Sequence, residues 1–462
     1  MVTHPGVGPA KRVDSPPARG DTVTSMTEDT REIQEKAYLI AVDTGEEDGW
    51  TAEESLLELA ALVETAGGEV VGSVSQKRAN IQPNLYLGTG KAAELKEAKA
   101  ATGFTAVVAD DELSPKQQRS LEKLLDVKVL GRSGVILDIF AQRARTHEGR
   151  LQVELAQLQY QLPRLTRLWT HLSRTGGGIG TRGPGETQLE TDRRVIRERI
   201  KTMKARVEDV RVRRETAARA RDKRLLPSVA IVGYTNAGKS TLLNALVGSN
   251  VVHVEDKLFA TLDPTARRVS LGDGQAVIAS DTVGFIHKLP HQLVDAFRAT
   301  LEEVVRADVL LEVVDAADRH AAEHRLTIRS VLDEIGAGHK PRVLVHNKID
   351  VLEGQESTPF VVPRGEPHAV AVSALTGEGL DHLRAELVAV LTELWVDVDL
   401  AVPYTAGALL SRLRERGSVD FDYRDADVRV HGRVAPALAG ELAEAARAWR
   451  RALKDPTTEQ GA

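Results

Sequence analysis

Residues 233–241 have the sequence Gly233-Tyr-Thr-Asn-Ala-Gly238-Lys239-Ser240-Thr241, between the apolar run Ser228–Val232 and a helical pattern. A glycine-rich loop between a strand and a helix, ending in Gly-Lys-Ser, is typical of a phosphate-binding P-loop. Its glycines let backbone N–H groups approach phosphates, and the helix N-terminus adds positive potential. In such a loop Lys239 contacts the β- and γ-phosphates, and the Ser240 hydroxyl binds Mg²⁺. An incidental glycine turn is the weaker alternative, because both flanking elements fit the motif.

Two further segments supply the remaining phosphate and magnesium contacts of such a site. Asp281-Thr-Val-Gly284 closes the apolar run Ala276–Ser280, 42 positions after Lys239. A carboxylate at a strand end can hold Mg²⁺ through water, and the Gly284 N–H can meet the γ-phosphate. Upstream, Phe259-Ala-Thr261-Leu-Asp-Pro lies where a switch loop supplies a hydroxyl to Mg²⁺, and we expect Thr261 to be that ligand.

The identity of the base is indicated by Asn347-Lys348-Ile-Asp350, which follows the strand-like run Val343–Val345. The Asp350 carboxylate can accept hydrogen bonds from both N1–H and the N2 amine of guanine. Adenine lacks this pair of donors, so it would leave the carboxylate unpaired at a cost of about 1–3 kcal/mol. Ser373-Ala374-Leu375 then offers a backbone N–H to guanine O6. The ordered set of four elements predicts a GTPase.

We therefore expect Lys239, Thr261 and Gly284 to act in GTP hydrolysis, and Ser240, Thr261 and Asp281 to bind Mg²⁺. The residues expected to bind GTP are Gly233, Tyr234, Thr235, Asn236, Ala237, Gly238, Lys239, Ser240, Thr241, Phe259, Ala260, Thr261, Asp281, Thr282, Val283, Gly284, Asn347, Lys348, Asp350, Ser373, Ala374 and Leu375.

The residue after Gly284 is Phe285, where many GTPases carry a glutamine that orients the attacking water. A phenylalanine side chain forms no hydrogen bond with water. We therefore expect slow intrinsic turnover unless a partner, another loop or a monovalent cation places the water. Asn236 in the P-loop is a candidate ligand for K⁺ beside the phosphates. The alternative, that Asn236 only shapes the loop, is equally open.

The composition limits the class of protein. At 462 residues, 42% of them hydrophobic, the chain is long enough for roughly three domains. It holds no apolar run of about 18 residues, so we expect no membrane span. Residues 1–35 are rich in Pro, Gly, Asp and Thr, which predicts a disordered tail. The absence of cysteine excludes disulfides, thiolate catalysis and thiolate zinc sites, and we expect a cytoplasmic location.

Short apolar runs alternate with helical patterns between residues 36 and 145, which predicts a small α/β domain with a mostly parallel sheet. The expected strands are Tyr38–Val42, Glu69–Val74, Thr105–Ala109 and Val127–Leu130, and the expected helices are Ala52–Thr65 and Pro115–Leu125.

Two long helical patterns follow, from Leu151 to about Ser173, with a kink expected at Pro163, and from Thr187 to about Arg224. The glycine-dense stretch 176–185 between them predicts the tip of a helical hairpin. Residues 142–225 hold 21 Lys and Arg against 10 Asp and Glu, whereas the rest of the chain holds 40 against 57. One basic segment in a protein of net charge −6 indicates a localised contact with a polyanion. A solvated helical face is the alternative, and charge alone does not separate the two.

Strand and helix patterns resume at Pro227 and continue to about Trp395, and the strand-like runs Ser418–Tyr423 and Asp427–Val430 precede a last helix. The expected fold is therefore multidomain α/β. Its expected parts are a disordered tail (1–35), an N-terminal α/β domain (36–145), a helical hairpin (146–226), a P-loop GTPase domain (227–397) and a small α+β C-terminal domain (398–462).

Six segments carry a resemblance to a known family. Outside the nucleotide motifs they are Asp110-Asp-Glu-Leu-Ser-Pro-Lys-Gln-Gln-Arg119, Ile136-Leu-Asp-Ile-Phe-Ala-Gln-Arg143-Ala-Arg-Thr, Gln152-Val-Glu-Leu-Ala-Gln-Leu and Gly177-Gly-Ile-Gly-Thr-Arg-Gly-Pro-Gly-Glu-Thr-Gln-Leu-Glu-Thr-Asp-Arg-Arg194. The other two are Phe259-Ala-Thr-Leu-Asp-Pro-Thr and Asp281-Thr-Val-Gly-Phe285-Ile. Over about residues 36–397 the chain resembles the HflX family, ribosome-associated GTPases of the Obg-like group.

The resemblance implies a monomeric factor that binds GTP and GDP and uses Mg²⁺. In that family the N-terminal domain and the hairpin bind the large ribosomal subunit, and GTP-bound members split stalled ribosomes. We therefore expect contacts with rRNA and ribosomal proteins. The residues expected to bind RNA are Arg174, Gly177, Gly178, Arg182, Arg193 and Arg194. The alternatives are a large-subunit assembly or regulatory switch without splitting activity, and a regulator of small RNA or protein complexes.

Two stretches stand apart from the expected pattern. The chain has Gly131-Arg132-Ser133 where family members commonly carry Asp-Arg-Thr, and nothing in the sequence explains this change. Gly88-Thr-Gly90-Lys91 suggests a second nucleotide site, since some family members use ATP through this domain. It lacks the first glycine of a P-loop, and Ala92 replaces the hydroxyl residue. A turn leading into a helix at Ala92–Ala100 is therefore favoured over an ATP site, and a turn that contacts RNA ranks between the two.

Overall fold

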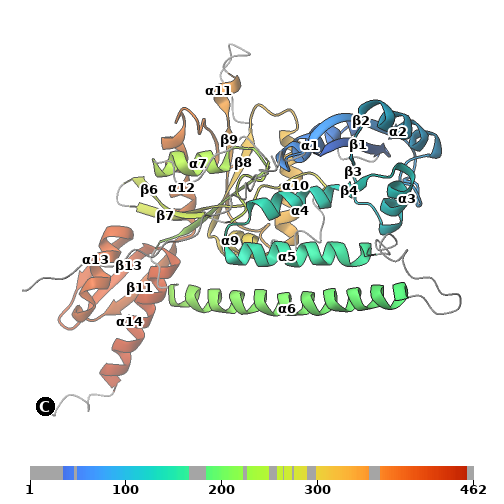
Figure 1. Cartoon of the computed structure of the whole chain (residues 1–462). Coiled ribbons are helices and arrows are strands. Elements are labelled where there is room, and N and C mark those ends of the chain that lie inside the picture. The colour runs from blue at the N-terminus through green and yellow to red at the C-terminus, as the bar shows by residue number, and fades with distance from the viewer. Residues whose placement is uncertain are drawn as a thin grey trace, which may run out of the picture. The chain divides into compact units, whose positions relative to one another are not determined.

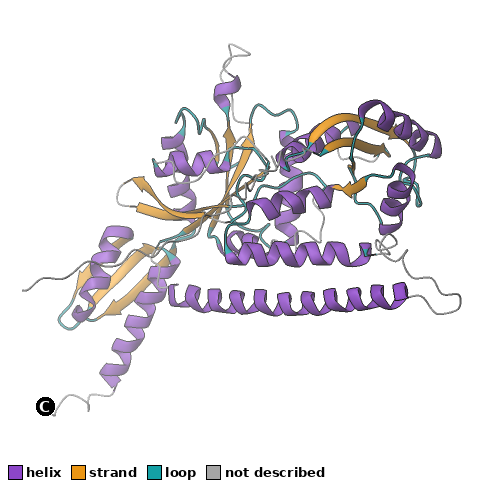
Figure 2. Cartoon of the chain, in the orientation of Figure 1, coloured by secondary structure: helices purple, strands orange, loops and turns teal. Residues whose placement is uncertain are grey.

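The structure is a computed structural model that describes residues 35–45, 49–165, 184–221, 226–248, 258–263, 265–272, 275–288, 298–352 and 365–454. Three sheets organise these residues, with four strands in the N-terminal part, six in the middle and three near the C-terminus. Figure 1 labels the elements and Figure 2 distinguishes the helices from the strands. The expected tail lies outside the described residues except for Glu35, as does most of the glycine-dense stretch 176–185.

The N-terminal sheet confirms the parallel α/β arrangement expected from the sequence. Its strands pair in parallel in the order β2-β1-β3-β4, and they are β1 (Lys36–Asp43), β2 (Glu69–Lys77), β3 (Ala106–Ala109) and β4 (Lys128–Gly131). Helices α1 (Ala52–Thr65) and α3 (Pro115–Leu125) have the expected bounds. Each begins with a capping box, at Thr51 and Ser114, which satisfies two backbone N–H groups of the helix end.

Two further helices belong to this part of the chain. Helix α2 (Thr89–Thr102) begins three residues earlier than the expected helix. Helix α4 (Arg132–Arg143) was not expected, and it starts within the unusual Gly131-Arg132-Ser133 stretch. Because most of its first turns are buried, α4 lacks the two-faced pattern by which a surface helix is recognised.

The two faces of the N-terminal sheet have different cores. On one face, Leu95 of α2 and Leu121 of α3 pack around Phe104. On the other face, α1 and α4 share a buried cluster with the six-stranded sheet, in which Phe140 of α4 and Phe285 both lie. The second core joins the N-terminal part to the elements that carry the nucleotide motifs.

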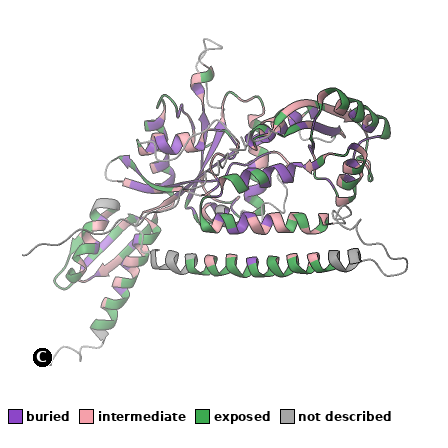
Figure 3. Ribbon diagram, in the orientation of Figure 1, coloured by how far each residue is buried: buried purple, intermediate pink, exposed green. Residues whose placement is uncertain are grey.

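The expected hairpin consists of α5 (His147–Gln161) and α6 (Pro184–Arg221), which run side by side in Figure 1. Nε of Arg199 in α6 lies 3.0 Å from Oε1 of Glu154 in α5. Pro163 does not kink a continuing helix; it lies in the 3₁₀ turn η1 (Leu162–Arg164), because its ring cannot follow an α-helical turn. Figure 3 shows α6 as largely exposed, and Met203 is the one buried side chain within 190–213.

The six-stranded sheet has the order β10-β9-β8-β5-β7-β6, with β6 antiparallel and the other strands parallel. Its strands are β5 (Ser228–Gly233), β6 (Thr265–Gly272), β7 (Gln275–Asp281), β8 (Val309–Asp315), β9 (Arg342–Asn347) and β10 (Ala369–Ala371). Its helices are α7 (Lys239–Val247), α9 (Arg298–Arg306), α10 (Ala321–Glu334), α11 (Ile349–Leu352) and α12 (Leu380–Glu393). The predicted nucleotide motifs follow β5, β7, β9 and β10, whose carboxyl ends meet at one edge of the sheet.

The C-terminal sheet is antiparallel, in the order β11-β13-β12. Strands β12 (Ser418–Tyr423) and β13 (Val428–Val434) and helix α14 (Pro436–Lys454) confirm the expected strand pair and last helix. Strand β11 (Val396–Val402), turn η2 (Tyr404–Ala406) and helix α13 (Gly407–Arg416) were not expected. Strand β11 crosses the boundary expected at residue 397. Across the ranges described above, no helix is long and apolar enough to cross a membrane.

Candidate guanine-nucleotide site

The P-loop connects β5 to α7, as the sequence predicts. Gly238 is the N-cap of α7 with a φ of 90°, and a Cβ at this position would lie 2.2 Å from Nδ2 of Asn347, so only glycine fits. That Nδ2 donates to the Ala237 carbonyl at 2.9 Å, while Oδ1 of Asn347 accepts from the Ala374 N–H at 2.9 Å. Asn347 therefore holds together the P-loop and the segment expected to read the base.

Lys239 is the first residue of α7 and is buried. Its Nζ donates to the Tyr234 carbonyl at 2.7 Å. Burial lowers the pKa of Lys239 to about 8, although the Asp281 carboxylate opposes this shift. Nucleotide phosphates beside the ammonium would favour its charged form. The lysine thus lies where a phosphate-binding role requires it.

The three residues expected to bind Mg²⁺ converge in one place. The Ser240 and Thr261 hydroxyls donate to Oδ2 of Asp281 at 2.6 Å and 2.8 Å, and the two hydroxyl oxygens lie 2.9 Å apart. The carboxylate is fully buried, and burial raises the pKa of Asp281 against the effect of Lys239. Thr261 and Asp281, which are 21 and 41 positions away from Ser240 in the sequence, therefore meet it at the end of β7.

Asp281 also offers a test of whether a cation fits here. Its Oδ1 is buried and has no hydrogen-bond partner among the residues that the structure describes. A buried carboxylate with one oxygen lacking a donor is costly, and a cation bound at the carboxylate would offset its charge. Hydroxyl and carboxylate oxygens are the hard ligands that Mg²⁺ prefers. The residues present therefore fit Mg²⁺.

Gly284 and Phe285 face different surroundings. A Cβ on Gly284 would lie 2.9 Å from Cα of Thr235 and 3.0 Å from Nζ of Lys239, so the backbone here packs tightly against the P-loop. The Phe285 side chain is buried in the core shared with α1 and α4. Its backbone N–H donates to the Gly233 carbonyl at 3.1 Å, and its carbonyl accepts from the Thr235 N–H at 2.7 Å. Phe285 thus belongs to the core and does not line the cavity described below.

The base-recognition segments also meet. Oδ1 of Asp350 accepts from the Ser373 hydroxyl at 2.6 Å, which orients the carboxylate at the start of α11. Ser373 Oγ accepts in turn from the Thr376 N–H at 3.1 Å. Lys348 has a φ of 66° and pairs with Asp315, with Nζ 2.8 Å from Oδ2. The Ser373 hydroxyl thus holds Oδ1 of the Asp350 carboxylate in the wall of the cavity described below.

These segments surround a cavity of about 460 Å³. Most of the expected GTP-binding residues line it, namely Thr235, Asn236, Gly238, Lys239, Ser240, Thr241, Phe259, Ala260, Thr261, Thr282, Gly284, Asn347, Lys348, Asp350, Ala374 and Leu375. The expected residues that do not line it are Gly233, Tyr234, Ala237, Asp281, Val283 and Ser373. Val351 lines the cavity and was not expected, although its place directly after Asp350 suggests contact with the base. The binding roles themselves stay predictions.

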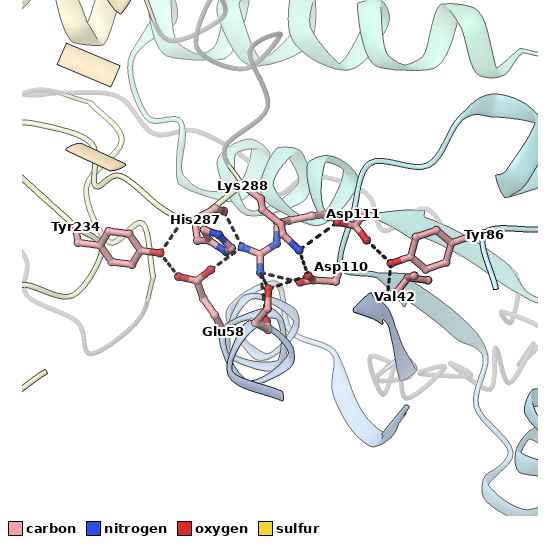
Figure 4. Close-up of polar contacts among 10 residues, drawn as sticks. Val42, Glu58, Tyr86, Asp110, Asp111, Tyr234, His287 and Lys288 are labelled. Carbon is pink, nitrogen blue, oxygen red and sulfur yellow. Dashed lines mark hydrogen bonds and ion pairs between the residues drawn. The ribbon is translucent and has the colours of Figure 1, made fainter. Parts of the chain in front are cut away.

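The Tyr234 side chain points away from this cavity, into a buried polar cluster (Figure 4). Its hydroxyl donates to Glu58 of α1 and accepts from the His287 N–H at 2.5 Å. Arg132, 1% exposed, donates to the His287 carbonyl at 2.8 Å and to Oε2 of Glu58 at 2.5 Å. This cluster ties the P-loop and the residues after Gly284 to the N-terminal sheet.

The same cluster extends to the end of β3 (Figure 4). Asp110 accepts from Arg132 Nη2 at 2.9 Å and from Lys288 Nζ at 2.7 Å, each through a different oxygen. Burial alone would raise the pKa of Asp110, but the two cations together hold it below its ordinary value. Neither Glu58 nor Arg132 was expected from the sequence to lie near the nucleotide motifs. Arg132 stands in the Gly131-Arg132-Ser133 stretch that had no explanation.

The expected RNA-binding residues are only partly visible. Arg174, Gly177, Gly178 and Arg182 lie outside the described residues. Arg193 is half-buried in α6 and donates to the Leu165 carbonyl at 3.1 Å, while Arg194 is exposed. At the second candidate nucleotide stretch, Gly88 is the N-cap of α2 and Lys91 pairs with Glu94 at 2.6 Å, which agrees with a turn leading into a helix.

Family models match nearly the whole described chain. Residues 53–141 match "GTP-binding GTPase N-terminal" and residues 143–221 match "GTP-binding GTPase Middle Region". Residues 228–348 match "50S ribosome-binding GTPase", and residues 363–452 match "HflX C-terminal domain".

Similar proteins are known from several bacteria. GTPase HflX of Lacrimispora saccharolytica is 46% identical over 92% of this chain and 100% of its own length. GTPase HflX of Escherichia coli is 45% identical over 87% of this chain and 92% of its own. A GTP-binding protein from the archaeon Sulfolobus solfataricus has a crystal structure in complex with GDP. It is 23% identical in sequence, and the alignment covers 78% of this chain and 100% of that one at a TM-score of 0.40.

The fold, the converging motifs and these matches define a P-loop GTPase, an enzyme that hydrolyses GTP. At this level of identity over nearly its full length, the chain belongs to the HflX family of GTPases.

Proposed function

We propose that the protein is a GTP-dependent factor that binds the large ribosomal subunit and splits or rescues stalled ribosomes. The observation that carries the ribosomal part is the match of residues 228–348 to a family of 50S ribosome-binding GTPases. A ribosomal partner would also account for the expected cytoplasmic location, since ribosomes work there.

The surface of α6 supports this proposal. Between residues 190 and 213 it carries more Lys and Arg than Asp and Glu, and most of the basic side chains are exposed. The exposed basic residues are Arg194, Arg197, Arg199, Lys201, Lys204, Arg206, Arg211 and Arg213. A long exposed helix with such a surface suits the phosphates of rRNA. The expected contacts of Arg174 and Arg182 belong to the same proposal.

The residues of the cavity suggest how GTP is held for hydrolysis. Lys239 and the P-loop N–H groups would bind the phosphates, and the Gly284 N–H would meet the γ-phosphate. Ser240, Thr261 and Asp281 would hold Mg²⁺, which neutralises charge on the phosphates when it is bound. The Phe285 side chain forms no hydrogen bond with water and therefore cannot orient the attacking water. The bound ribosome, or a K⁺ ion near Asn236, is proposed to supply that function.

Splitting and mere binding are distinguished by density-gradient profiles of 70S ribosomes mixed with the protein and a non-hydrolysable GTP analogue. A splitting factor converts 70S particles to subunits. An assembly or regulatory factor, the second candidate, would instead migrate with free large subunits and leave 70S particles intact. Migration with neither would contradict both proposals and favour a regulator of other complexes.

Reversing two charges on α6 should weaken ribosome binding. For Lys201→Glu with Lys204→Glu we expect about a tenfold or larger loss of affinity for the large subunit, and a log–log salt dependence shallower by about two. Intrinsic GTP hydrolysis should not change, because both side chains are exposed on the hairpin. Pelleting with purified large subunits across a salt series measures the effect.

The matched control is Arg447→Glu with Arg450→Glu, which reverses two exposed charges at the same spacing on α14. An equal loss with this control would show that overall charge matters rather than the α6 surface.

Potassium dependence separates the two interpretations of Asn236. If Asn236 binds K⁺, turnover should be about tenfold or more higher in KCl than in NaCl, because a cation beside the phosphates stabilises the transition state. Asn236→Ala should then remove the difference while GDP still binds. Equal rates in the two salts would leave Asn236 with only a shaping role in the loop.

A further inference from the structure

The switch loop that carries Thr261, described over residues 258–263, contacts both α4 and the start of α5. Phe259 is 2% exposed and has a φ of 54°, an uncommon backbone conformation for a side chain of this size. Its ring meets Phe140 of α4 edge to face, with centroids 4.7 Å apart. Leu262 is buried in the same cluster. Two of the six residues are therefore anchored in the core shared with the N-terminal part.

A third anchor is polar. Oδ2 of Asp263 accepts from the Arg145 N–H and the Thr146 N–H, each at 2.9 Å. Oδ1 accepts from the Thr146 hydroxyl at 2.5 Å. Thr146 is the N-cap of α5, and its hydroxyl oxygen also accepts from the Gly149 N–H at 3.0 Å. From a loop 117 positions further along the chain, the carboxylate thus binds the N-cap residue of α5 and the residue before it.

Thr261 lies between these anchors. With Phe259 and Asp263 fixed on either side, its hydroxyl is 2.8 Å from Oδ2 of Asp281 and 2.9 Å from Ser240 Oγ. This is the arrangement in which all three oxygens can share one metal ion. The loop therefore contacts α5 and the candidate Mg²⁺ site at the same time.

We propose that Asp263 is a positioning residue that holds Thr261 in its metal-binding arrangement by docking the first switch loop on the N-terminus of α5. The proposal rests on the proposed role of Thr261 in binding Mg²⁺. A switch loop closes on the metal when a γ-phosphate is present and is released when it is absent. Docking through Asp263 therefore stabilises the GTP state relative to the GDP state.

The contact has a consequence for the hairpin. Helix α5 pairs with α6 through Glu154 and Arg199, so the helix whose N-cap residue binds Asp263 also contacts the exposed basic helix. Coupling between two sites is reciprocal. A partner that holds the hairpin in the position seen here favours GTP over GDP, and GTP favours that position of the hairpin.

The test compares the affinities of the full-length protein for GMPPNP and for GDP, both with Mg²⁺. For Asp263→Ala we expect the preference for GMPPNP over GDP to fall about tenfold, while GDP affinity stays as in the wild type. The two N–H groups that lose their acceptor are near solvent, so water can replace the carboxylate and the fold should persist. An unchanged preference would overturn the proposal.

A second variant approaches the contact from α5. A Cβ on Gly149 would lie 2.6 Å from Oδ1 of Asp263 and 3.0 Å from Thr146 Oγ1, so Gly149→Ala should displace the carboxylate. Because alanine favours a helix over glycine, general destabilisation is not expected. We predict the same loss of GMPPNP preference. The control is Gly90→Ala near the start of α2, where an added Cβ meets nothing within 4 Å, and it should leave the preference unchanged.

The variant Thr261→Ala distinguishes an error in the docking role of Asp263 from an error in the proposed Mg²⁺ site. If Thr261→Ala lowers the GMPPNP preference and Asp263→Ala does not, the docking role of Asp263 is wrong and the Mg²⁺ site stands. If neither variant changes the preference, the role of Thr261 is wrong and the proposal falls with it. A lower GMPPNP preference in Thr261→Ala, Asp263→Ala and Gly149→Ala supports the proposed docking of the switch loop on α5.

Discussion

Replacing Lys239 by alanine is expected to weaken GTP and GDP binding by about 10- to 100-fold. The ammonium is buried at the start of α7 beside the Asp281 carboxylate, in the wall of the cavity that is lined by all four guanine-nucleotide motifs. A charge-assisted hydrogen bond to phosphate contributes about 1.5–3 kcal/mol, and tenfold in affinity corresponds to about 1.4 kcal/mol. Titration with a fluorescent GDP or GTP analogue measures the effect.

The control for this variant is Lys91→Ala. Lys91 lies in the Gly88-Thr-Gly90-Lys91 stretch and pairs with Glu94 on the surface of α2. If that stretch is only a turn, Lys91→Ala leaves guanine-nucleotide and ATP binding unchanged. GTP affinity that survives Lys239→Ala would contradict the assignment of the phosphate site.

Asp350→Asn is expected to exchange the base preference from guanine to xanthine. The carboxylate can accept from two guanine donors, whereas the asparagine amide presents an N–H₂ group to them and can donate to the 2-oxo group of xanthine. We expect GTP affinity to fall about 10- to 100-fold and XTP affinity to rise, from about 1–3 kcal/mol per mismatched polar contact. Displacement of a labelled GDP analogue by GTP and by XTP measures both affinities.

The fold should tolerate Asp350→Asn, because Oδ1 accepts from the Ser373 hydroxyl and an amide oxygen can do the same. Asp381→Asn, on the exposed start of α12, is the matched control and should change neither affinity. A weaker GTP affinity without any gain for XTP would show that Asp350 supports the site without contacting the base.

Local patterns were sufficient for much of the fold. The bounds of α1 and α3 follow from capping residues next to the helices they begin, and the P-loop follows from the sequence between β5 and α7. Helix α4 was missed because its buried first turns hide the helical period. Strand β11 was missed despite the alternation in Val396–Val402, because its partner β13 is distant in sequence.

Contacts between distant segments could not be predicted from the sequence. The sequence identified Thr261 and Asp281 as candidate ligands because each belongs to a motif of known chemistry. It offered no sign that Arg132 would bind the His287 carbonyl, 155 positions away, or that Asp263 would bind the N-cap residue of α5. Such contacts depend on how the N-terminal sheet packs against the GTPase sheet, and no local periodicity records that packing.

The large ribosomal subunit is the partner that we propose for this GTPase. The most direct test is steady-state GTP turnover with and without purified large subunits, in potassium buffer and at matched protein concentration. We predict strong stimulation, because Phe285 is buried in the core and cannot orient the attacking water, a function that we propose the bound subunit supplies. Turnover that does not change across a range of subunit concentrations would contradict the proposed role of the large subunit.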